Sequence, residues 1–279
     1  MQVARRDELV RRAVSCRLSS NTTRTYRAQW RRWERWAAGA ECSPANVCRF
    51  LAELAETRKV STVRTALAAL SAEYPGLRTH PAVQATMKGL SRIHGTKQKQ
   101  ARAMDDRASQ QVVEWLETSG KPTARQDIAL IETMRDGMLR RSEASNIRWE
   151  DIEADADGSG ILTIPVSKAD QEGKGTVVYL SRQAMRAIDK LPKVKHGPFA
   201  LHPATIARRL RAAAQKAGLG DGFSGHSCRI GMAQDLAQAG TDLTQLMNAG
   251  RWKSANMPAY YTRNQSAKKG AIAQWRSRQ

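Results

Sequence analysis

The sequence of 279 residues is poor in cysteine and has no long apolar run. None of its four cysteines belongs to a CxxC pair, and their spacing fits neither a zinc site nor a disulfide framework. These cysteines are Cys16, Cys42, Cys48 and Cys228. No stretch of about 18 apolar residues exists, which argues against a membrane-spanning helix. The amino-terminal segment also lacks the apolar core of a secretion signal, so we expect a reduced, intracellular protein.

Acidic residues are scarce relative to basic ones. Lys and Arg number 46 against 26 Asp and Glu, which gives a formal net charge of +20 at pH 7. Residues 1–104 hold 20 basic and 7 acidic residues, whereas residues 105–279 hold 26 and 19. This excess argues against an ordinary near-neutral metabolic enzyme. It favours a polyanionic partner, nucleic acid before anionic membrane, because every neutralised phosphate releases condensed counterions.

The amino-terminal third has the apolar spacing of helices. Ser20 or Asn21 is suited to cap a helix from about Thr22 to Ala38, and Gly39 is suited to end it. Apolar residues recur along this segment at helical spacing, namely Tyr26, Trp30, Trp33 and Ala37. Arginines recur on another face with the same period, namely Arg24, Arg27, Arg31 and Arg35. We interpret them as phosphate contacts, and the alternative is a solvated cationic face.

Three further helices are predicted before the chain becomes irregular. They begin near Ser43-Pro44, Ser61 and Pro81, because a capping hydroxyl or a first-turn proline marks a helix start. Residues 95–107 then lose the apolar period and gain charge, including Lys97 and Lys99. We interpret them as an exposed linker between a helical DNA-binding domain at 1–94 and a second domain at 108–279.

The second domain is predicted to be mixed. Helical spacing covers about 109–118 and 124–138, and the chain returns to helix from Pro203 onward. Residues 161–166 and 176–180 are typical of two strands, and a polar, glycine-bearing turn joins them as a hairpin. The predicted fold class is therefore mainly α with a small β-sheet.

Four short motifs in this domain carry groups suited to phosphate chemistry. They are MLRRSE at 138–143, Lys168 on the hairpin turn, GHSCR at 225–229, and GRW at 250–252 followed by Tyr261. Taken singly, each has an ordinary structural explanation. An HxxR sequence is more often a capped helix start, a tyrosine pair is usually packing, and a hairpin lysine is usually solvated.

Taken together, in this order and spacing, the motifs resemble the tyrosine recombinase (phage integrase) family. The resemblance covers most of the chain. It implies an amino-terminal helical, SAM-like core-binding domain and a carboxy-terminal catalytic domain that form a C-shaped clamp on DNA. The family pattern places its catalytic residues at Arg140, Glu143, Lys168, His226, Arg229, Trp252 and Tyr261.

This sequence departs from the family pattern at a few packing positions. Met138 stands where a glycine commonly precedes Leu-Arg, Ala144 replaces a larger aliphatic residue, and Cys228 replaces the usual leucine. Two assignments depend on spacing alone. Tyr260 adjoins Tyr261, and Lys174 lies on the same turn as Lys168.

The resemblance implies a site-specific recombinase that exchanges DNA strands through a 3′-phosphotyrosine link and a Holliday junction, with no cofactor and no metal. It implies a homotetramer on inverted-repeat duplex DNA. A short terminal helix, residues 267–275, would dock on a neighbouring protomer through Ala271, Ile272 and Trp275. The predicted helices begin within about 20 residues of Met1, so we expect no additional amino-terminal domain.

The expected location is the cytoplasm, on the nucleoid, with no membrane contact. Two alternatives stay open. One is a non-catalytic, integrase-derived DNA-binding regulator. The other is a related strand transferase, such as a topoisomerase or a hairpin telomere resolvase.

Overall fold

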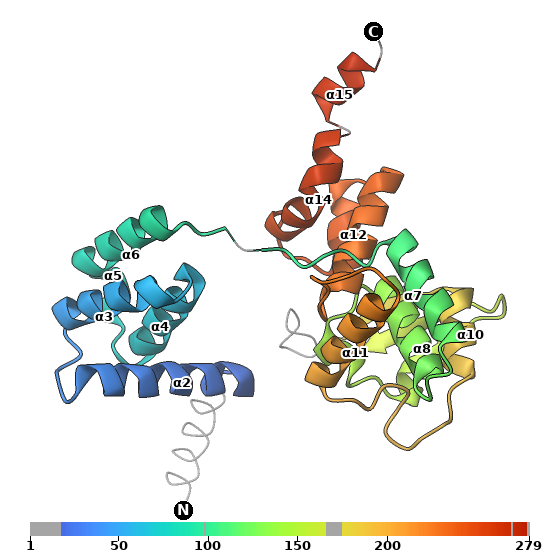
Figure 1. Cartoon of the computed structure of the whole chain (residues 1–279), viewed down its shortest axis with the longest axis horizontal. Helices are drawn as coiled ribbons and strands as arrows, with labels where there is room; N and C mark the ends of the chain where they lie inside the picture. Colours follow the sequence, from blue (N-terminus) through green and yellow to red (C-terminus); the bar gives the residue numbers. More distant parts are fainter. Residues whose placement is uncertain (1–17, 98, 166–174, 269, 278–279) are drawn as a thin grey trace, which may run out of the picture. The chain divides into compact units, whose positions relative to one another are not determined.

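The computed structural model describes all residues except 1–17, 98, 166–174, 269 and 278–279. The chain divides into two compact units, Met1–Lys99 and Gln100–Gln279 (Figure 1). Each unit has its own buried apolar cluster. Within the described part of the chain, no helix is both long and apolar enough to cross a membrane.

The amino-terminal unit is helical throughout its described part. Its helices are α2 (Ser20–Ala37), α3 (Pro44–Thr57), α4 (Val60–Glu73), α5 (Gly76–Thr79) and α6 (Pro81–His94). The Ser43 hydroxyl accepts a hydrogen bond from Asn46 N and caps α3, as predicted. The helices enclose an aromatic and aliphatic core, in which the ring centroids of Trp33 and Phe50 lie 5.3 Å apart, edge to face.

Helix α2 begins two residues earlier than the sequence predicts. Its cap is Ser19, which accepts a hydrogen bond from Thr22 N, rather than Ser20 or Asn21. Trp33 is buried on the inner side, and the four periodic arginines are all exposed. The helix ends before Ala38, which has the left-handed φ of 46°, and Gly39 follows with φ 90°. Helical spacing from Ser61 onward predicts Tyr74 on the inner side with Val63, Leu67 and Leu70, but Tyr74 follows the end of α4 and is 49 % exposed.

The carboxy-terminal unit combines a small sheet with many helices (Figure 1). Strands β1 (Ile152–Ala154), β2 (Gly160–Ile164) and β3 (Thr176–Leu180) pair antiparallel in that order. The predicted hairpin is confirmed, since Ile164 pairs with Thr176 and Gly160 with Leu180. Strand β1 was not predicted, because three residues are too short to show a period.

Helices cover this sheet and form the rest of the unit. They are α7 (Asp106–Thr118), α8 (Ala124–Asp136), α9 (Arg141–Ala144), α10 (Arg182–Asp189), α11 (Pro203–Lys216), α12 (Ser227–Ala239), α13 (Leu243–Gly250), α14 (Asn256–Lys268) and α15 (Ala271–Arg276), with a 3-10 turn at Trp149–Asp151. Helix α8 contacts α7, α10 and α12, and Leu130, Ile131 and Met134 on it are fully buried. The chain therefore has the predicted fold class.

The second half of the predicted linker is packed on the carboxy-terminal unit rather than fully exposed. Residues 100–105 run along the carboxy-terminal unit, where Arg102 N donates to Gly222 O at 2.9 Å and Met104 N donates to Ser227 O at 2.9 Å. The Met104 side chain is fully buried, and Arg135 donates to its carbonyl oxygen. A side chain at Gly231 would collide with the Met104 carbonyl. The absence of a Cβ there therefore allows residues 100–105, which we call the strap, to contact α12.

The carboxy terminus differs from the single short helix predicted at 267–275. Helix α14 continues through Lys268, and α15 begins at Ala271 after Gly270. On α15, Ile272 is 79 % exposed and Trp275 is 56 % exposed. The two apolar side chains therefore contribute little to the core of their own unit.

Candidate active site

Arg140 and Glu143 are held together at the start of α9. The backbone N–H of Arg140 donates to Glu143 Oε2 at 2.9 Å, and its guanidinium donates to Glu143 Oε1 at 2.6 Å. The Glu143 side chain is nearly buried, at 3 % exposed, whereas that of Arg140 is 19 % exposed. Arg140 is therefore oriented by a buried carboxylate and keeps a surface toward solvent.

The charge of Glu143 is secured by its partners. Burial alone would raise its pKa. The hydrogen bond from the Arg140 backbone and the charges of Arg251 and Arg140 outweigh burial, so the pKa lies below its ordinary value. Glu143 is consequently ionised at neutral pH and acts as an acceptor only.

Arg229 lies inside the unit, on the first turns of α12. Its guanidinium donates to Met138 O at 2.5 Å and also to Gly250 O. Burial, followed by the positive charges of Arg140 and Arg251, lowers its pKa to about 9. It remains largely protonated at neutral pH, so the structure concentrates positive charge around these side chains.

Trp252 and Tyr261 lie against the guanidinium of Arg229. The Arg229 Cζ atom is 4.7 Å from the centroid of the Trp252 ring, a cation–π distance. The Trp252 and Tyr261 rings are 5.8 Å apart and tilted by 58°. The ring of Trp252 also covers Gly250, where any Cβ would collide with it.

Tyr261 lies on α14 and is 8 % exposed. Burial raises the pKa of its phenol, while the charges of Arg229 and Arg140 lower it in part. Tyr260 is half-buried, and its ring centroid lies 5.9 Å from that of Tyr261 and 5.2 Å from Arg263 Cζ. Tyr261 is thus the tyrosine that contacts Trp252, and Tyr260 is the neighbour directed to Arg263.

His226 immediately precedes α12 and is exposed. Partial desolvation, then the charges of Arg229, Arg140 and Arg141, lower the pKa of its imidazole. The imidazole is therefore neutral at neutral pH, and one ring nitrogen is available as a proton acceptor.

Some predicted positions fall elsewhere. Lys168 and its alternative Lys174 lie outside the described residues. The six predicted DNA contacts are all exposed and belong to the other unit, namely Arg24, Arg27, Arg31, Arg35, Lys97 and Lys99. Among the described residues, no group of three or more His, Cys, Asp or Glu side chains is arranged to hold a metal ion.

The three residues that depart from the family pattern are all buried. Met138 has φ 43°, the left-handed conformation that favours glycine, and its side chain is buried beside Tyr261 and Ile230. Ala144 and Cys228 are fully buried, and burial raises the pKa of the Cys228 thiol to about 12. Cys228 therefore acts as an apolar side chain rather than a reactive thiol.

Sequence reasoning missed Arg251. It belongs to the GRW motif, yet no role was expected for it. Its guanidinium donates to Glu143 Oε2 at 2.8 Å and to Gly137 O at 2.7 Å. The positive φ of 52° at this residue is not visible in a single sequence, and these acceptors are more than a hundred positions away along the chain.

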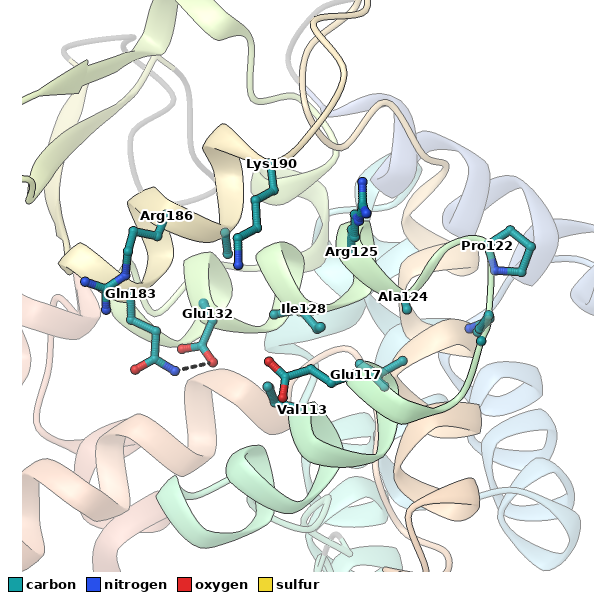
Figure 2. A pocket seen from close by; sticks show the side chains of 14 residues that line it. Val113, Glu117, Pro122, Ala124, Arg125, Ile128, Glu132, Gln183, Arg186 and Lys190 are labelled. Carbon is teal, nitrogen blue, oxygen red and sulfur yellow. Dashed lines mark hydrogen bonds between the residues drawn. The ribbon is translucent and has the colours of Figure 1, made fainter.

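A groove of about 920 Å³ on the same unit is a separate feature. It lies between α7, α8 and α10. Two of its lining residues are joined by a hydrogen bond, in which the Gln183 amide donates to Glu132 at 2.9 Å (Figure 2). Carboxylates and cations both line it, including Glu117 and Lys190. None of the predicted catalytic residues that the structure describes lines this groove, so the arginine and tyrosine cluster is the candidate site.

The sequence and the fold are similar to those of known proteins. A relative is the recombinase Cre of Escherichia phage P1, 25% identical over an alignment of 208 residues; the match covers 64% of this chain and 61% of the relative. The chain thus matches less than two thirds of that protein's length. A solved structure of the XerH recombinase bound to a palindromic difH substrate has a TM-score of 0.67 at 15% identity, covering 90% of this chain and 78% of that chain.

A lambda integrase dimer bound to a COC′ core site has a TM-score of 0.63 at 15% identity, covering 92% of this chain and 75% of the other. At such identities these likenesses establish the fold.

Two family models match the sequence. The N-terminal SAM-like domain of phage integrases matches residues 13–79, and the phage integrase family itself matches residues 102–268. Because the latter match covers more than half of the chain, the protein belongs to the phage integrase family.

Proposed function

We propose that the protein is a tyrosine-type site-specific DNA recombinase, which cuts and rejoins DNA through a 3′-phosphotyrosine intermediate. The observation that carries the proposal is the single cluster formed by Arg140, Arg229, Trp252 and Tyr261. Arg140 directly precedes α9, Arg229 lies on α12, Trp252 lies in the loop before α14, and Tyr261 lies on α14. A phenol directed into a group of guanidinium cations is suited to attack a phosphodiester.

The reaction is a transesterification. The phenolic oxygen of Tyr261 forms a bond to phosphorus and loses its proton, while the bond from phosphorus to the 5′ oxygen breaks and that oxygen takes up a proton. The product is a 3′-phosphotyrosyl link and a free 5′-hydroxyl. Attack by a 5′-hydroxyl from a second strand reverses the step, and because the ester bond is conserved no nucleotide hydrolysis is required.

The two arginines supply electrostatic stabilisation. Guanidinium groups match phosphate oxygens bidentately and remain charged, so Arg140 and Arg229 would neutralise the charge of the pentacoordinate transition state. Glu143 would act through Arg140, which it holds at 2.6 Å. Trp252 would donate its indole N–H to a phosphate oxygen and support the ring of Tyr261.

Proton transfer is assigned to one base and one acid. A phenol with a raised pKa is a poor nucleophile at neutral pH, so Tyr261 needs an acceptor for its proton. The neutral imidazole of His226 is suited to this role. We assign protonation of the departing 5′ oxygen to Lys168 by the family pattern, with Lys174 as the alternative.

DNA binding and assembly complete the proposal. We propose that the exposed arginines of α2 and the lysines at 97 and 99 contact phosphates, and that the two units form a C-shaped clamp around duplex DNA with an inverted-repeat site. A solved lambda integrase is a tetramer on a Holliday junction. We propose the same state here, reached by docking α15 on a neighbouring protomer through Ile272 and Trp275.

Covalent capture tests the chemistry. The probe is a duplex selected by binding from a randomised pool, then nicked so that the fragment carrying the 5′-hydroxyl diffuses away after cleavage. Wild-type protein should form a denaturant-resistant adduct. Tyr261→Phe should bind the duplex with unchanged affinity and form none, and the matched control Tyr260→Phe should form the adduct. Capture by Tyr261→Phe would transfer the nucleophilic role to Tyr260.

The same duplex separates the alternatives. A DNA-binding regulator would give no adduct with any variant. A topoisomerase would form the adduct and relax supercoils without joining two sites, whereas a recombinase joins them.

Deletion of residues 266–279 should abolish pairing of two sites and spare binding to one. Full recombination by the truncated protein would contradict the tail's role. Location on the nucleoid in the cytoplasm is part of the proposal.

A further inference from the structure

Arg251 has an unusual backbone and an almost fully buried side chain. It follows α13 with φ 52°, a left-handed conformation that costs about 1–2 kcal/mol for a residue with a Cβ. Its side chain is 7 % exposed. A long charged side chain in a strained and buried position needs a compensating set of contacts.

The Arg251 guanidinium bonds to groups that also hold Arg140 and Arg229, the two proposed phosphate-binding arginines. One terminal nitrogen donates to Gly137 O at 2.7 Å, and the other donates to Glu143 Oε2 at 2.8 Å and Met138 O at 3.3 Å. Met138 O is also the acceptor for Arg229, and Glu143 is also the acceptor for Arg140. Arg251 is therefore bonded to an acceptor of each arginine.

We propose that Arg251 is a positioning residue for the transesterification, acting through Glu143 and the Gly137–Met138 carbonyls to fix Arg140 beside Arg229. The inference rests on the proposed function and deepens it. Arg251 requires no direct contact with substrate for this role, because it bonds Glu143, which in turn holds the more exposed Arg140.

Charge gives this arrangement a second consequence. Glu143 Oε1 accepts from Arg140, and Oε2 accepts from the Arg140 backbone and from Arg251. With Arg251 present, one carboxylate is shared between two guanidinium groups. Without it, the same carboxylate would neutralise Arg140 alone and draw it away from the phosphate. Arg251 also directly precedes Trp252, so it ties the Trp252 segment to the loop that carries Arg140.

The test substitutes the side chain without disturbing the backbone. Arg251→Gly removes the guanidinium, and glycine adopts φ 52° without strain. We expect single-turnover cleavage of the nicked duplex to fall about 10- to 100-fold, since small misplacement of a catalytic group has effects of this size. Duplex affinity should be unchanged. Arg251→Lys should recover only part of the rate, because an ammonium lacks the planar fork that bridges these acceptors.

Arg182→Ala is the matched control. It removes one positive charge from the same unit, at an exposed pair with Asp157, and should cleave at the wild-type rate. Cleavage is measured well below the melting temperature of every variant. If Arg251→Gly lowers the melting temperature but cleaves like wild type, Arg251 is merely structural and the inference is overturned. Failure of the wild type to form an adduct would instead overturn the proposed function.

A double-variant cycle tests the route through Glu143. In the Glu143→Gln background the carboxylate is gone, so adding Arg251→Gly should reduce the rate much less than it does in the wild type. An equal loss in both backgrounds would show that Arg251 acts independently of Glu143. That result would contradict the proposed route.

Discussion

Arginine has two different settings in the two units. On α2 the side chains of Arg24 and Arg35 are exposed, at one face of a helix whose other face packs on the aromatic core. In the carboxy-terminal unit Arg229 and Arg251 are enclosed, and carbonyl oxygens or a carboxylate fix their guanidinium groups. An exposed arginine contributes charge, which many positions can supply, whereas an enclosed one contributes geometry, which a single position supplies.

The largest effect is expected where charge and geometry coincide, at Arg229. Arg229→Ala should reduce covalent capture about 10²–10³-fold, the loss typical of a transition-state donor. It should also lower the free energy of unfolding by about 3 kcal/mol, because the carbonyls of Met138 and Gly250 lose a charged partner. Urea denaturation and adduct gels measure the two effects. If Arg229→Ala had the same free energy of unfolding as the wild type, enclosed and exposed arginines would not differ in their contribution to stability.

The opposite pattern is expected for α2. Replacing its four periodic arginines by alanine should leave the urea midpoint nearly unchanged, since exposed substitutions usually shift stability by less than about 0.5 kcal/mol. Duplex affinity should fall, and its salt dependence should weaken by about 0.9 in log–log slope for each phosphate that is no longer neutralised. Lysine at the same positions is the control and should retain most of the affinity. An unchanged slope would show that this face is only solvated.

The comparison extends to two residues with the same left-handed backbone. Met138 has φ 43° and is buried, whereas Ala38 has φ 46° and is exposed. Met138→Gly relieves about 1–2 kcal/mol of strain but removes a buried side chain worth more, so we expect a net loss of about 2 kcal/mol. Ala38→Gly removes only an exposed methyl group and should gain about 0.5–1 kcal/mol. Thermal melts measure both changes, and a change in melting temperature of the same sign in the two variants would contradict this difference.

The smallest effect is expected from His226. Its pKa is lowered in the folded protein, so the unfolded chain binds a proton first as the pH falls. Stability from this group is therefore present above its unfolded pKa of about 6.5 and is lost as the pH falls through the lower folded value. Between pH 7 and 5, wild type should lose more stability than His226→Gln. A larger loss in the variant would mean that the imidazole is stabilised in its charged form.

Much of the fold follows from local signals. The Ser43-Pro44 and Pro81 helix starts were confirmed because caps and first-turn prolines act within one turn. The strand-like runs at 161–166 and 176–180, joined by a polar, glycine-bearing stretch, identified the hairpin. Helix α10 was missed because it has only 8 residues, and the break at Gly270 was missed because glycine in a helical pattern does not always end it.

The candidate site depends on longer-range information. The motifs around Arg140, Arg229 and Tyr261 are visible in the sequence, and resemblance to a family supplied the roles expected of these residues. What joins them is not visible, since Met138 and Gly250 contribute backbone carbonyls, which any residue possesses. For the same reason Arg251 was overlooked. Its importance derives from a backbone conformation and from acceptors that only the folded chain brings close.

The strap at residues 100–105 has a practical implication for dissecting this protein. Its backbone is bonded to Gly222 and Ser227, directly beside His226 and the first turn of α12. A truncation that starts with the first helix of the unit, at Asp106, would uncover the surface of Gly231 and leave Arg135 without one of its acceptors. An isolated carboxy-terminal fragment should therefore begin no later than Gln100 if its proposed catalytic side chains are to keep their positions.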